Sequence, residues 1–477
     1  MIDPYTRKTQ WLRDIYPIEG KFLRDLSGKE PKMGRLANIQ LANDIQEDRG
    51  PNEPVNDSIL EENDPWFNSF YRDLNDYAEQ ALTTIGTEPI SYNEVLNSKE
   101  KEQWLLAMKN ELEELKRQDT WALTDLPSDR KALKGRWVLK LKQPTNEKPI
   151  YKARWVAKGF QQRPGIDFSE TYANTVNPIS YRLLLALAAY NDWEIDQWDI
   201  KSAYPNASLT ETVYIEQPIG FNDNSNRVCR LNKALYGLKQ SAREWEQHFK
   251  GLASKLDLKP LNTDQSVYIT RDPAKILVLI VYVDDILAIS DKKELIHDAY
   301  TALGKLGLIV KNLGPISTFL GIEITRDRPN RSIRLSQEAY IKKILNRFNK
   351  PIKDTKAISP IPLGVKLEPN PDTASPEEIN QYQQEIGSIN YLMTKTRPDL
   401  AYSVGLLSRF MANPSLLHRK ALDHLWKYLG YTWNLGLLFH SSPNSLIGYT
   451  DADWGGDIGT RKSTIGYTFL FRGAAIA

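Results

Sequence analysis

The sequence predicts an α+β fold in which amphipathic helices and antiparallel strands occupy separate stretches of the chain. Residues 276–283 and 286–289 are short, apolar and β-branched, and they flank two adjacent carboxylates, Asp284 and Asp285. A polar pair between two such runs is typical of a β-hairpin with a polar tip. Apolar residues between positions 100 and 118 recur instead at helical spacing. Both kinds of element are therefore expected.

The composition is that of a large globular protein. The 477 residues suffice for roughly two to four domains, and a hydrophobic fraction of 41% supports real cores. One cysteine, Cys229, and five histidines exclude a disulfide framework and argue against a structural zinc site, which fits a reducing, intracellular compartment. No apolar run approaches the roughly 20 residues that span a bilayer, and the first residues lack the order of a secretory signal.

Residues 1–85 are polar and show no periodicity. Between positions 44 and 64 there are eight acidic residues against one basic residue, Arg49, with glycine and proline interspersed. Such a segment cannot bury enough apolar surface to fold alone. We expect a disordered linker.

Ordered structure is expected from about residue 90. Ser91 and Glu94 have the spacing of a capping box, which marks the start of a helix. The helical stretch 100–118 then places one set of apolar residues on a single face: Trp104, Ala107, Met108, Leu112 and Leu115. This face is interpreted as core.

Residues 130–163 carry an unusual charge, with eleven lysines and arginines against one acid, Glu147. Four aromatic residues are interleaved with them: Trp137, Tyr151, Trp155 and Phe160. Segments 138–142 and 151–156 alternate like the two strands of a hairpin. A solvated basic face is the plain alternative, but positive strands studded with aromatic residues also suit a surface that follows phosphates, and we favour that interpretation.

Two neighbouring carboxylates in an apolar hairpin are costly unless a cation compensates them. An acidic turn exposed to water is the alternative, but the apolar flanks of Asp284 and Asp285 favour a divalent metal site, and Mg²⁺ suits oxygen ligands. Upstream, residues 193–199 alternate like a half-buried strand that ends at Asp199. We expect Asp199 to meet the hairpin pair at one metal site.

The C-terminal part contains further helical patterns. Residues 360–376 are rich in proline and are expected to form a loop. The predicted helices are 337–348, 385–393, 399–410 and 417–429.

Several segments together resemble one family. Residues 199–204 and 282–285 look like motifs A and C of a reverse transcriptase palm. Residues 151–161 and 165–172 resemble the fingers of copia-type (pseudovirus) retrotransposon reverse transcriptases. The pattern continues, in one order, through residues 198–204, 213–221, 235–241, 282–285, 319–324 and 335–337. The resemblance implies a right-hand polymerase of fingers, palm and thumb, followed by connection helices and a partial ribonuclease H-like domain.

The resemblance also implies roles for single residues. Asp199, Asp284 and Asp285 resemble the catalytic triad, which binds Mg²⁺ or Mn²⁺ and extends the 3′-hydroxyl of a primer by two-metal nucleotidyl transfer. Lys152 and Arg154 resemble the cations that grip the triphosphate of the incoming deoxynucleotide. The implied partners are an RNA template, a DNA primer and deoxynucleoside triphosphates, with no membrane.

Two further residues of the nucleotide pocket are implied. Tyr204 resembles the aromatic gate that excludes a ribose 2′-hydroxyl, although its spacing alone leaves a core aromatic equally open. Gln240 resembles the glutamine that lines the nucleotide pocket near the template strand, whereas its sequence context alone favours an amide on a helix surface. The residues themselves leave both alternatives open.

The implied division of the chain follows the order of the motifs. Residues 319–324 would form the primer-gripping strand, and 337–348 the start of the thumb. The expected segments are a linker at 1–85, fingers and palm at 86–335, thumb and connection helices at 336–440, and the start of a ribonuclease H-like domain at 441–477. The expected location is intracellular, in the cytoplasm within a virus-like particle and in the nucleus.

Asp451 resembles the first metal ligand of the family's ribonuclease H domain. The segments that supply its remaining carboxylates do not follow in the sequence, so we expect no ribonuclease H activity. The chain also departs from the family at several positions: Trp155, Asn174, Thr175, Pro205, Ala207 and Ala242. These departures keep a second hypothesis open, a non-catalytic remnant that still binds nucleic acid. A DNA-templated repair polymerase is disfavoured by the form of residues 282–285.

Overall fold

The computed structural model describes residues 89, 91–142, 148–272, 274–350, 357–362, 364–440, 446–456 and 461–477. The linker expected at 1–85 lies outside these residues. The chain divides into two compact units. Among the described residues, the larger unit draws on the ranges 85–337, 436–449 and 467–477, and the smaller unit on 338–435 and 450–466. The described residues form helices and sheets of antiparallel strands. The predicted α+β class is therefore confirmed.

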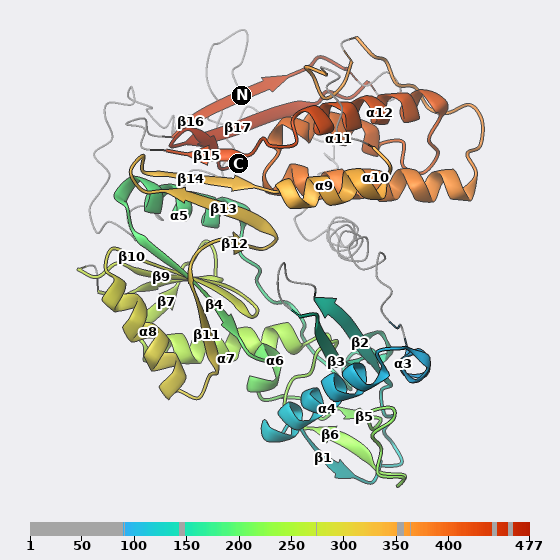
Figure 1. Cartoon of the computed structure of the whole chain (residues 1–477), viewed down its shortest axis with the longest axis vertical. Coiled ribbons are helices and arrows are strands. Elements are labelled where there is room, and N and C mark those ends of the chain that lie inside the picture. Colours follow the sequence, from blue (N-terminus) through green and yellow to red (C-terminus); the bar gives the residue numbers. More distant parts are fainter. Residues whose placement is uncertain are drawn as a thin grey trace, which may run out of the picture. The chain divides into compact units, whose positions relative to one another are not determined.

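The centre of the larger unit is a six-stranded sheet with the strand order β11-β4-β10-β9-β8-β7 (Figure 1). Helices α7 (Ser241–Lys255) and α8 (Lys293–Lys305) share one hydrophobic core with this sheet. The strands are β4 (Glu194–Ile200), β7 (Leu258–Pro260), β8 (Val267–Thr270), β9 (Leu277–Tyr282), β10 (Asp285–Ser290) and β11 (Val310–Pro315).

The predicted hairpin around the paired carboxylates is confirmed as β9 and β10, which pair in antiparallel register from Tyr282 and Asp285 onward. The turn between them contains Val283, whose φ is 54°. Strand β4 is also present where it was predicted. Its description as half-buried is wrong, because residues 195–198 are all buried and both faces of the strand are covered.

A second layer of the larger unit consists of the hairpin β2 (Gly135–Lys142) and β3 (Ile150–Ala157) on helix α4 (Lys101–Arg117) (Figure 1). The predicted hairpin is confirmed, with Lys140 opposite Lys152. The apolar face of α4 packs against the inner face of the hairpin through Trp104, Met108, Leu112, Leu115, Trp137, Leu139, Ala153 and Trp155. One face of the hairpin is therefore core, and the alternate residues carry the positive charge.

Short elements complete this layer. Helix α3 (Tyr92–Asn97) begins as predicted, because the Ser91 hydroxyl accepts a hydrogen bond from the Glu94 N–H and donates one to the Glu94 carboxylate. A three-stranded sheet has the order β1-β6-β5. The remaining elements are β1 (Trp121–Thr124), η1 (Gly159–Gln161), α5 (Pro178–Asn191), α6 (Ala203–Asn206), β5 (Tyr214–Ile215) and β6 (Val228–Leu231).

The strand predicted at 319–324 is instead a tight hairpin, and this prediction is wrong. Leu320 and Gly321 have φ values of 50° and 72°, so the chain reverses between β12 and β13. The sheet continues through β14 to β15. Its strands are β12 (Thr318–Phe319), β13 (Ile322–Asp327), β14 (Ser332–Ser336) and β15 (Leu437–Phe439).

The smaller unit is mainly helical. Its core contains Tyr382, Ile389 and Trp426, each at most 2% exposed. The four predicted helices are present, and the second is longer than expected because Ser375 and Glu378 form a capping box with Pro376 in the first turn. The helices are α9 (Glu338–Arg347), α10 (Pro376–Lys395), η2 (Pro398–Leu400), α11 (Ala401–Ser408) and α12 (Leu416–Tyr431).

The last strands are β16 (Ile447–Ala452), β17 (Ile465–Phe471) and β18 (Ala474–Ala475). Among the described helices, none is both long enough and apolar enough to cross a membrane.

Candidate active site

Asp199, Asp284 and Asp285 come together at one end of the central sheet. Asp285 lies directly opposite Asp199 in the register of β10 and β4, so their side chains leave the sheet on the same face. The N–H of Ile200 donates to the Asp284 carbonyl at 2.7 Å, which ties the turn to the end of β4. Two segments that are 85 residues apart in the sequence (Asp199 and Asp284) are thus joined by backbone hydrogen bonds.

The pKa of the Asp284 carboxyl is set by its burial and by the charges around it. Burial raises the pKa of this carboxyl, the nearby charge of Asp199 adds to the rise, and Arg154 and Lys152 oppose it. The side chain is still 34% exposed. Three carboxylates offer only oxygen ligands, which suits Mg²⁺ or Mn²⁺. In the described part of the chain, however, no three Asp, Glu, His or Cys side chains already enclose a position for a metal ion.

Lys152 and Arg154 approach the carboxylates from β3. They are two residues apart on a strand and therefore share a face, while Trp155 points into the core and is only 1% exposed. The Arg154 Nη2 atom lies 3.9 Å from Asp284 Oδ2. Half of the Arg154 side chain is exposed, so this ion pair is weak and leaves the guanidinium accessible to an anion.

Two tyrosines stand beside this ion pair. The rings of Tyr204 and Tyr236 meet edge to face with centroids 4.9 Å apart, and Arg154 Cζ lies 4.8 Å from the centroid of Tyr236. Burial raises the pKa of Tyr204 to about 12, and the charge of Asp284 contributes. Pro205 is buried within α6. Tyr204 is thus both a core-contacting aromatic and a neighbour of Asp284.

Tyr236 is one of two residues near this ion pair that the sequence did not indicate. It belongs to the segment 235–241, in which only Gln240 was singled out. Its carbonyl accepts a hydrogen bond from the Ala157 N–H at 2.8 Å, and Gly237 follows with a φ of 89°. The tyrosine directly before a glycine was the available signal, because such a glycine often allows two backbones to approach closely.

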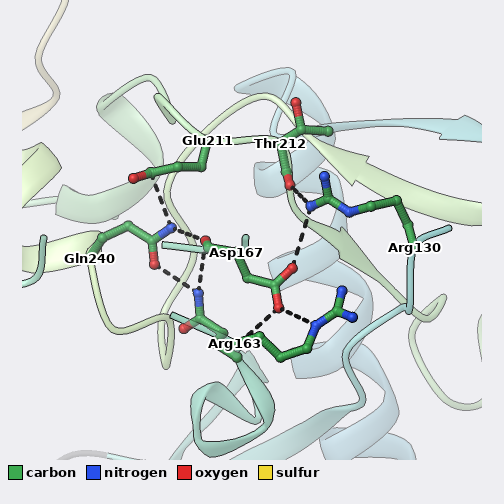
Figure 2. Close-up of polar contacts among 7 residues, drawn as sticks. Arg130, Arg163, Asp167, Glu211, Thr212 and Gln240 are labelled. Atoms are coloured by element: carbon green, nitrogen blue, oxygen red, sulfur yellow. Dashed lines mark hydrogen bonds and ion pairs between the residues drawn. The ribbon is translucent and has the colours of Figure 1, made fainter. Parts of the chain in front are cut away.

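Gln240 is fully buried, at 0% exposed, and stands at the N-cap of α7. The alternative of an amide on the helix surface is therefore wrong. Its amide hydrogen-bonds the Gln162 side chain, the Asp167 carbonyl and the Glu211 carboxylate (Figure 2). Its contact with a nucleotide stays a prediction.

Asp451 lies on β16 and is exposed. Its carboxylate accepts a hydrogen bond from the Ala452 N–H at 2.9 Å. Asp453 is also exposed and accepts from the N–H groups of Thr464 and Gly456.

Glu111, on α4, is a second residue that the sequence did not indicate. Burial raises the pKa of its carboxyl to about 7, although Arg154 and a backbone hydrogen bond from Trp155 pull it down. Glu114, one turn further on, forms an ion pair with Lys201 at 2.6 Å. Glu111 is thus a partly protonated acid, near neutral pH, next to the strand that carries Arg154.

Glu111→Gln is expected to stabilise the protein at pH 8 and to have little effect at pH 4. Between about pH 4.5 and pH 7 the folded state keeps a proton that the unfolded state has released, so the free energy of unfolding falls as the pH rises. The glutamine removes that loss, which is on the order of 3 kcal/mol. Urea unfolding of both proteins at the two pH values measures it. An equal difference at pH 4 and pH 8 would contradict this account of Glu111.

Comparison with known proteins gives a family match. Residues 118–362, just over half of the chain, match the family model described as "Reverse transcriptase (RNA-dependent DNA polymerase)". Among curated relatives, the "Retrovirus-related Pol polyprotein from transposon TNT 1-94" of Nicotiana tabacum is 40% identical over 409 residues, covering 84% of this chain and 31% of the relative. The corresponding polyprotein from transposon RE1 of Arabidopsis thaliana is 35% identical over 378 residues, covering 77% and 25%.

A yeast relative is more distant. The "Transposon Ty1-NL2 Gag-Pol polyprotein" of Saccharomyces cerevisiae is 30% identical over 415 residues, covering 82% of this chain and 23% of the relative. The chain therefore spans between about a quarter and a third of these relatives. Among solved structures, a foamy viral protease-reverse transcriptase in complex with double-stranded DNA is 12% identical, with a TM-score of 0.43, covering 79% of this chain and 55% of that one.

Proposed function

Because this chain belongs to the reverse transcriptase family, in its copia type, we propose that it is an RNA-directed DNA polymerase. It extends the 3′-hydroxyl of a primer on an RNA template by two-metal nucleotidyl transfer. The observation that carries the proposal is the meeting of Asp199 with Asp284 and Asp285 at the end of one sheet, with Arg154 facing them. We assign the hairpin β2–β3 to the fingers, the six-stranded sheet to the palm and the helices from α9 onward to the thumb and connection.

In this proposal the three carboxylates hold Mg²⁺ or Mn²⁺. Such ions, when bound, neutralise the charge that develops between the attacking hydroxyl and the triphosphate. The fixed register of β4 and β10 sets the separation of Asp199 from Asp285 before any ligand binds. The protein's own contribution is therefore a fixed backbone register that brings the carboxylates to one place, while their side chains must still turn to enclose an ion.

Lys152 and Arg154 bind the triphosphate of the incoming deoxynucleotide. Both project from the same face of β3, and Arg154 already lies near Asp284. A guanidinium suits this task because it can contact two phosphate oxygens at once. The triphosphate would thereby be held between the basic strand and the carboxylates.

Tyr204 lies under the sugar and excludes a ribose 2′-hydroxyl by its ring. Support comes from its ring contact with Tyr236 and from the influence of the Asp284 charge on its hydroxyl. Gln240 lines the nucleotide pocket from the inside of the protein, where its side chain is fully buried.

Arg154→Ala is expected to raise the KM for the deoxynucleotide about tenfold or more, because a charge-assisted contact to phosphate contributes about 1.5–3 kcal/mol. The dissociation constant of the template–primer is expected to change much less. Steady-state primer extension at varied nucleotide concentration measures the first quantity, and equilibrium binding of a labelled RNA–DNA duplex the second. The matched control is Arg136→Ala, which changes a basic residue of β2 that lies opposite Val156. If the Arg154→Ala protein is active and keeps the KM of the unmutated chain, Arg154 does not bind the nucleotide and is simply part of a solvated basic face.

Primer extension with an RNA template, a DNA primer and Mg²⁺ or Mn²⁺ tests the function itself. Extension that depends on both the template and the metal is the expected result. Binding of the duplex without extension by either metal would contradict the proposal and favour the non-catalytic remnant.

A further inference from the structure

A buried polar cluster lies at the junction of η1, the loop that follows it and the start of α7 (Figure 2). We name it the Asp167 clamp and define it by Gln162, Asp167 and Gln240. These side chains are 5%, 2% and 0% exposed. Polar groups buried to this degree are costly unless each finds a partner.

The carboxylate of Asp167 is held by two arginines. It accepts hydrogen bonds from the Arg163 N–H at 2.9 Å, from Arg163 Nε at 3.3 Å and from Arg130 Nη2 at 3.3 Å. Arg130 also donates to the Thr212 carbonyl (Figure 2). The buried charge is thus compensated, and it fixes the loop of residues 163–167.

The backbone of that loop is joined to α7 by two amides. The Asp167 carbonyl accepts from Gln240 Nε2 at 2.9 Å and from Gln162 Nε2 at 3.3 Å. Gln162 Nε2 also donates to Gln240 Oε1 at 2.8 Å, while Gln162 Oε1 accepts from the Lys239 N–H at 2.8 Å. The clamp therefore secures the main chain at residues 239–240.

The other end of the same segment rests on β3. The Ala157 N–H donates to the Tyr236 carbonyl, and a Cβ at Gly237 would lie 2.2 Å from the Ala157 carbonyl oxygen. A Cβ at Gly159 would likewise lie 2.1 Å from the Gly237 carbonyl oxygen. Residues 236–240 are thus seated on residues 157–162 at both ends, with no room for side chains between the backbones.

Tyr236 is the residue of this seated segment that reaches the site. Its ring contacts both Arg154 and Tyr204. A shift of residues 239–240 relative to β3 would therefore move the ring between the residue proposed to bind phosphate and the residue proposed to select the sugar.

We propose that the Asp167 clamp positions Tyr236, and that Asp167 and Gln162 are positioning residues that set nucleotide affinity and sugar discrimination without touching the nucleotide. This inference rests on the proposed function, since it assigns these properties to the same site. Hydrogen-bond networks in a buried site fix one arrangement of their members, which is what a preorganised pocket requires.

The experiment uses two variants of the full chain and one control. Asp167→Asn removes the charge with little change of shape. Gln162→Met removes, at nearly constant volume, the bonds of Gln162 to the Asp167 carbonyl, the Gln240 side chain and the Lys239 N–H. The control is Asp223→Asn, an exposed carboxylate that bonds Gln217, Ser225 and Arg227 in a different turn. Two readouts are taken for each: deuterium exchange at the amides of Ala157 and Lys239, and steady-state extension of oligo(dT) on poly(rA) with dTTP or UTP.

In both clamp variants we expect faster exchange at Ala157 and Lys239, a higher KM for dTTP and a lower preference for dTTP over UTP. A small misplacement of a binding group can cost up to about 100-fold in rate, so a loss of kcat/KM between about 10-fold and 100-fold is expected. Asp223→Asn is expected to match the unmutated chain in every readout.

The possible failures are distinguishable. If the unmutated chain extends no primer, the proposed function fails, while the exchange rates still decide whether the clamp holds residues 236–240. If exchange is unchanged in both variants, or if it rises while KM and sugar preference stay constant, the positioning role is overturned and the cluster only stabilises the fold. Should Asp167→Asn fail to fold, Gln162→Met carries both readouts.

Discussion

Replacing Asp284 by asparagine is expected to lower the rate of primer extension at least about 10³-fold. Residues that bind the catalytic metal ions together act as one unit, so removing one of them disables the others as well. Asparagine keeps the size of the side chain but loses the negative charge that a metal ion requires. The backbone bond from Ile200 to the residue 284 carbonyl is kept, so the hairpin is expected to stay folded. Single-turnover extension at saturating Mg²⁺ measures the rate.

The matched control is Asp291→Asn. Asp291 follows directly after β10, at the opposite end of the same strand from Asp285. Its replacement is expected to leave the extension rate within about twofold, since surface substitutions away from special features have small effects. A similar loss in both variants would point to general damage of the sheet, and a nearly active Asp284→Asn protein would remove the carboxylate from the mechanism.

The second large effect concerns stability. Asp399→Ala is expected to lower the free energy of unfolding of the smaller unit by about 3 kcal/mol or more, because it leaves a buried guanidinium charge without its only described carboxylate partner, although its hydrogen bonds to Thr432 remain. Arg397 is 1% exposed and forms a two-pronged pair with the Asp399 carboxylate, at 2.9 Å from Nε and 2.8 Å from Nη2. Asp399 also accepts a hydrogen bond from the Tyr428 hydroxyl.

Asp423→Ala is the matched control for this effect. Its carboxylate is 53% exposed and pairs with Lys350 on the surface of the same unit. Exposed ion pairs contribute about 0–1 kcal/mol, so only a small change is expected. Urea unfolding followed by tryptophan fluorescence compares the two variants. Equal losses would show that the burial of Arg397 does not matter for stability.

The carboxylate centre was predictable from the sequence because its signals are local. The apolar runs on either side of Asp284 and Asp285 have the length and composition of paired strands, and a polar pair between them indicates the turn. Asp199 ends another strand with a clear pattern. The sequence did not show that these two strands are neighbours in the sheet. The structure shows it, because β4 and β10 pair with Asp199 opposite Asp285.

Other features depend on segments that meet only in the folded chain. The burial of Gln240 follows from Gln162 and Asp167, which lie 78 and 73 positions away. The raised pKa of Glu111 likewise follows from packing against β3. The turn at Leu320 was missed for a different reason, since a leucine with positive φ has no sequence signature and is uncommon.

The bond from Ile200 to the Asp284 carbonyl and the pairing of Asp285 with Asp199 make the site sensitive to insertions and deletions. Side chains alternate between the two faces of a strand, so losing one residue between Glu194 and Asp199 would turn Asp199 to the opposite face of the sheet. Losing two residues would restore the face but displace the carboxylate along the strand by about 7 Å. Substitutions that keep the length of β4 leave this geometry in place, whereas any change in its length separates the two halves of the centre.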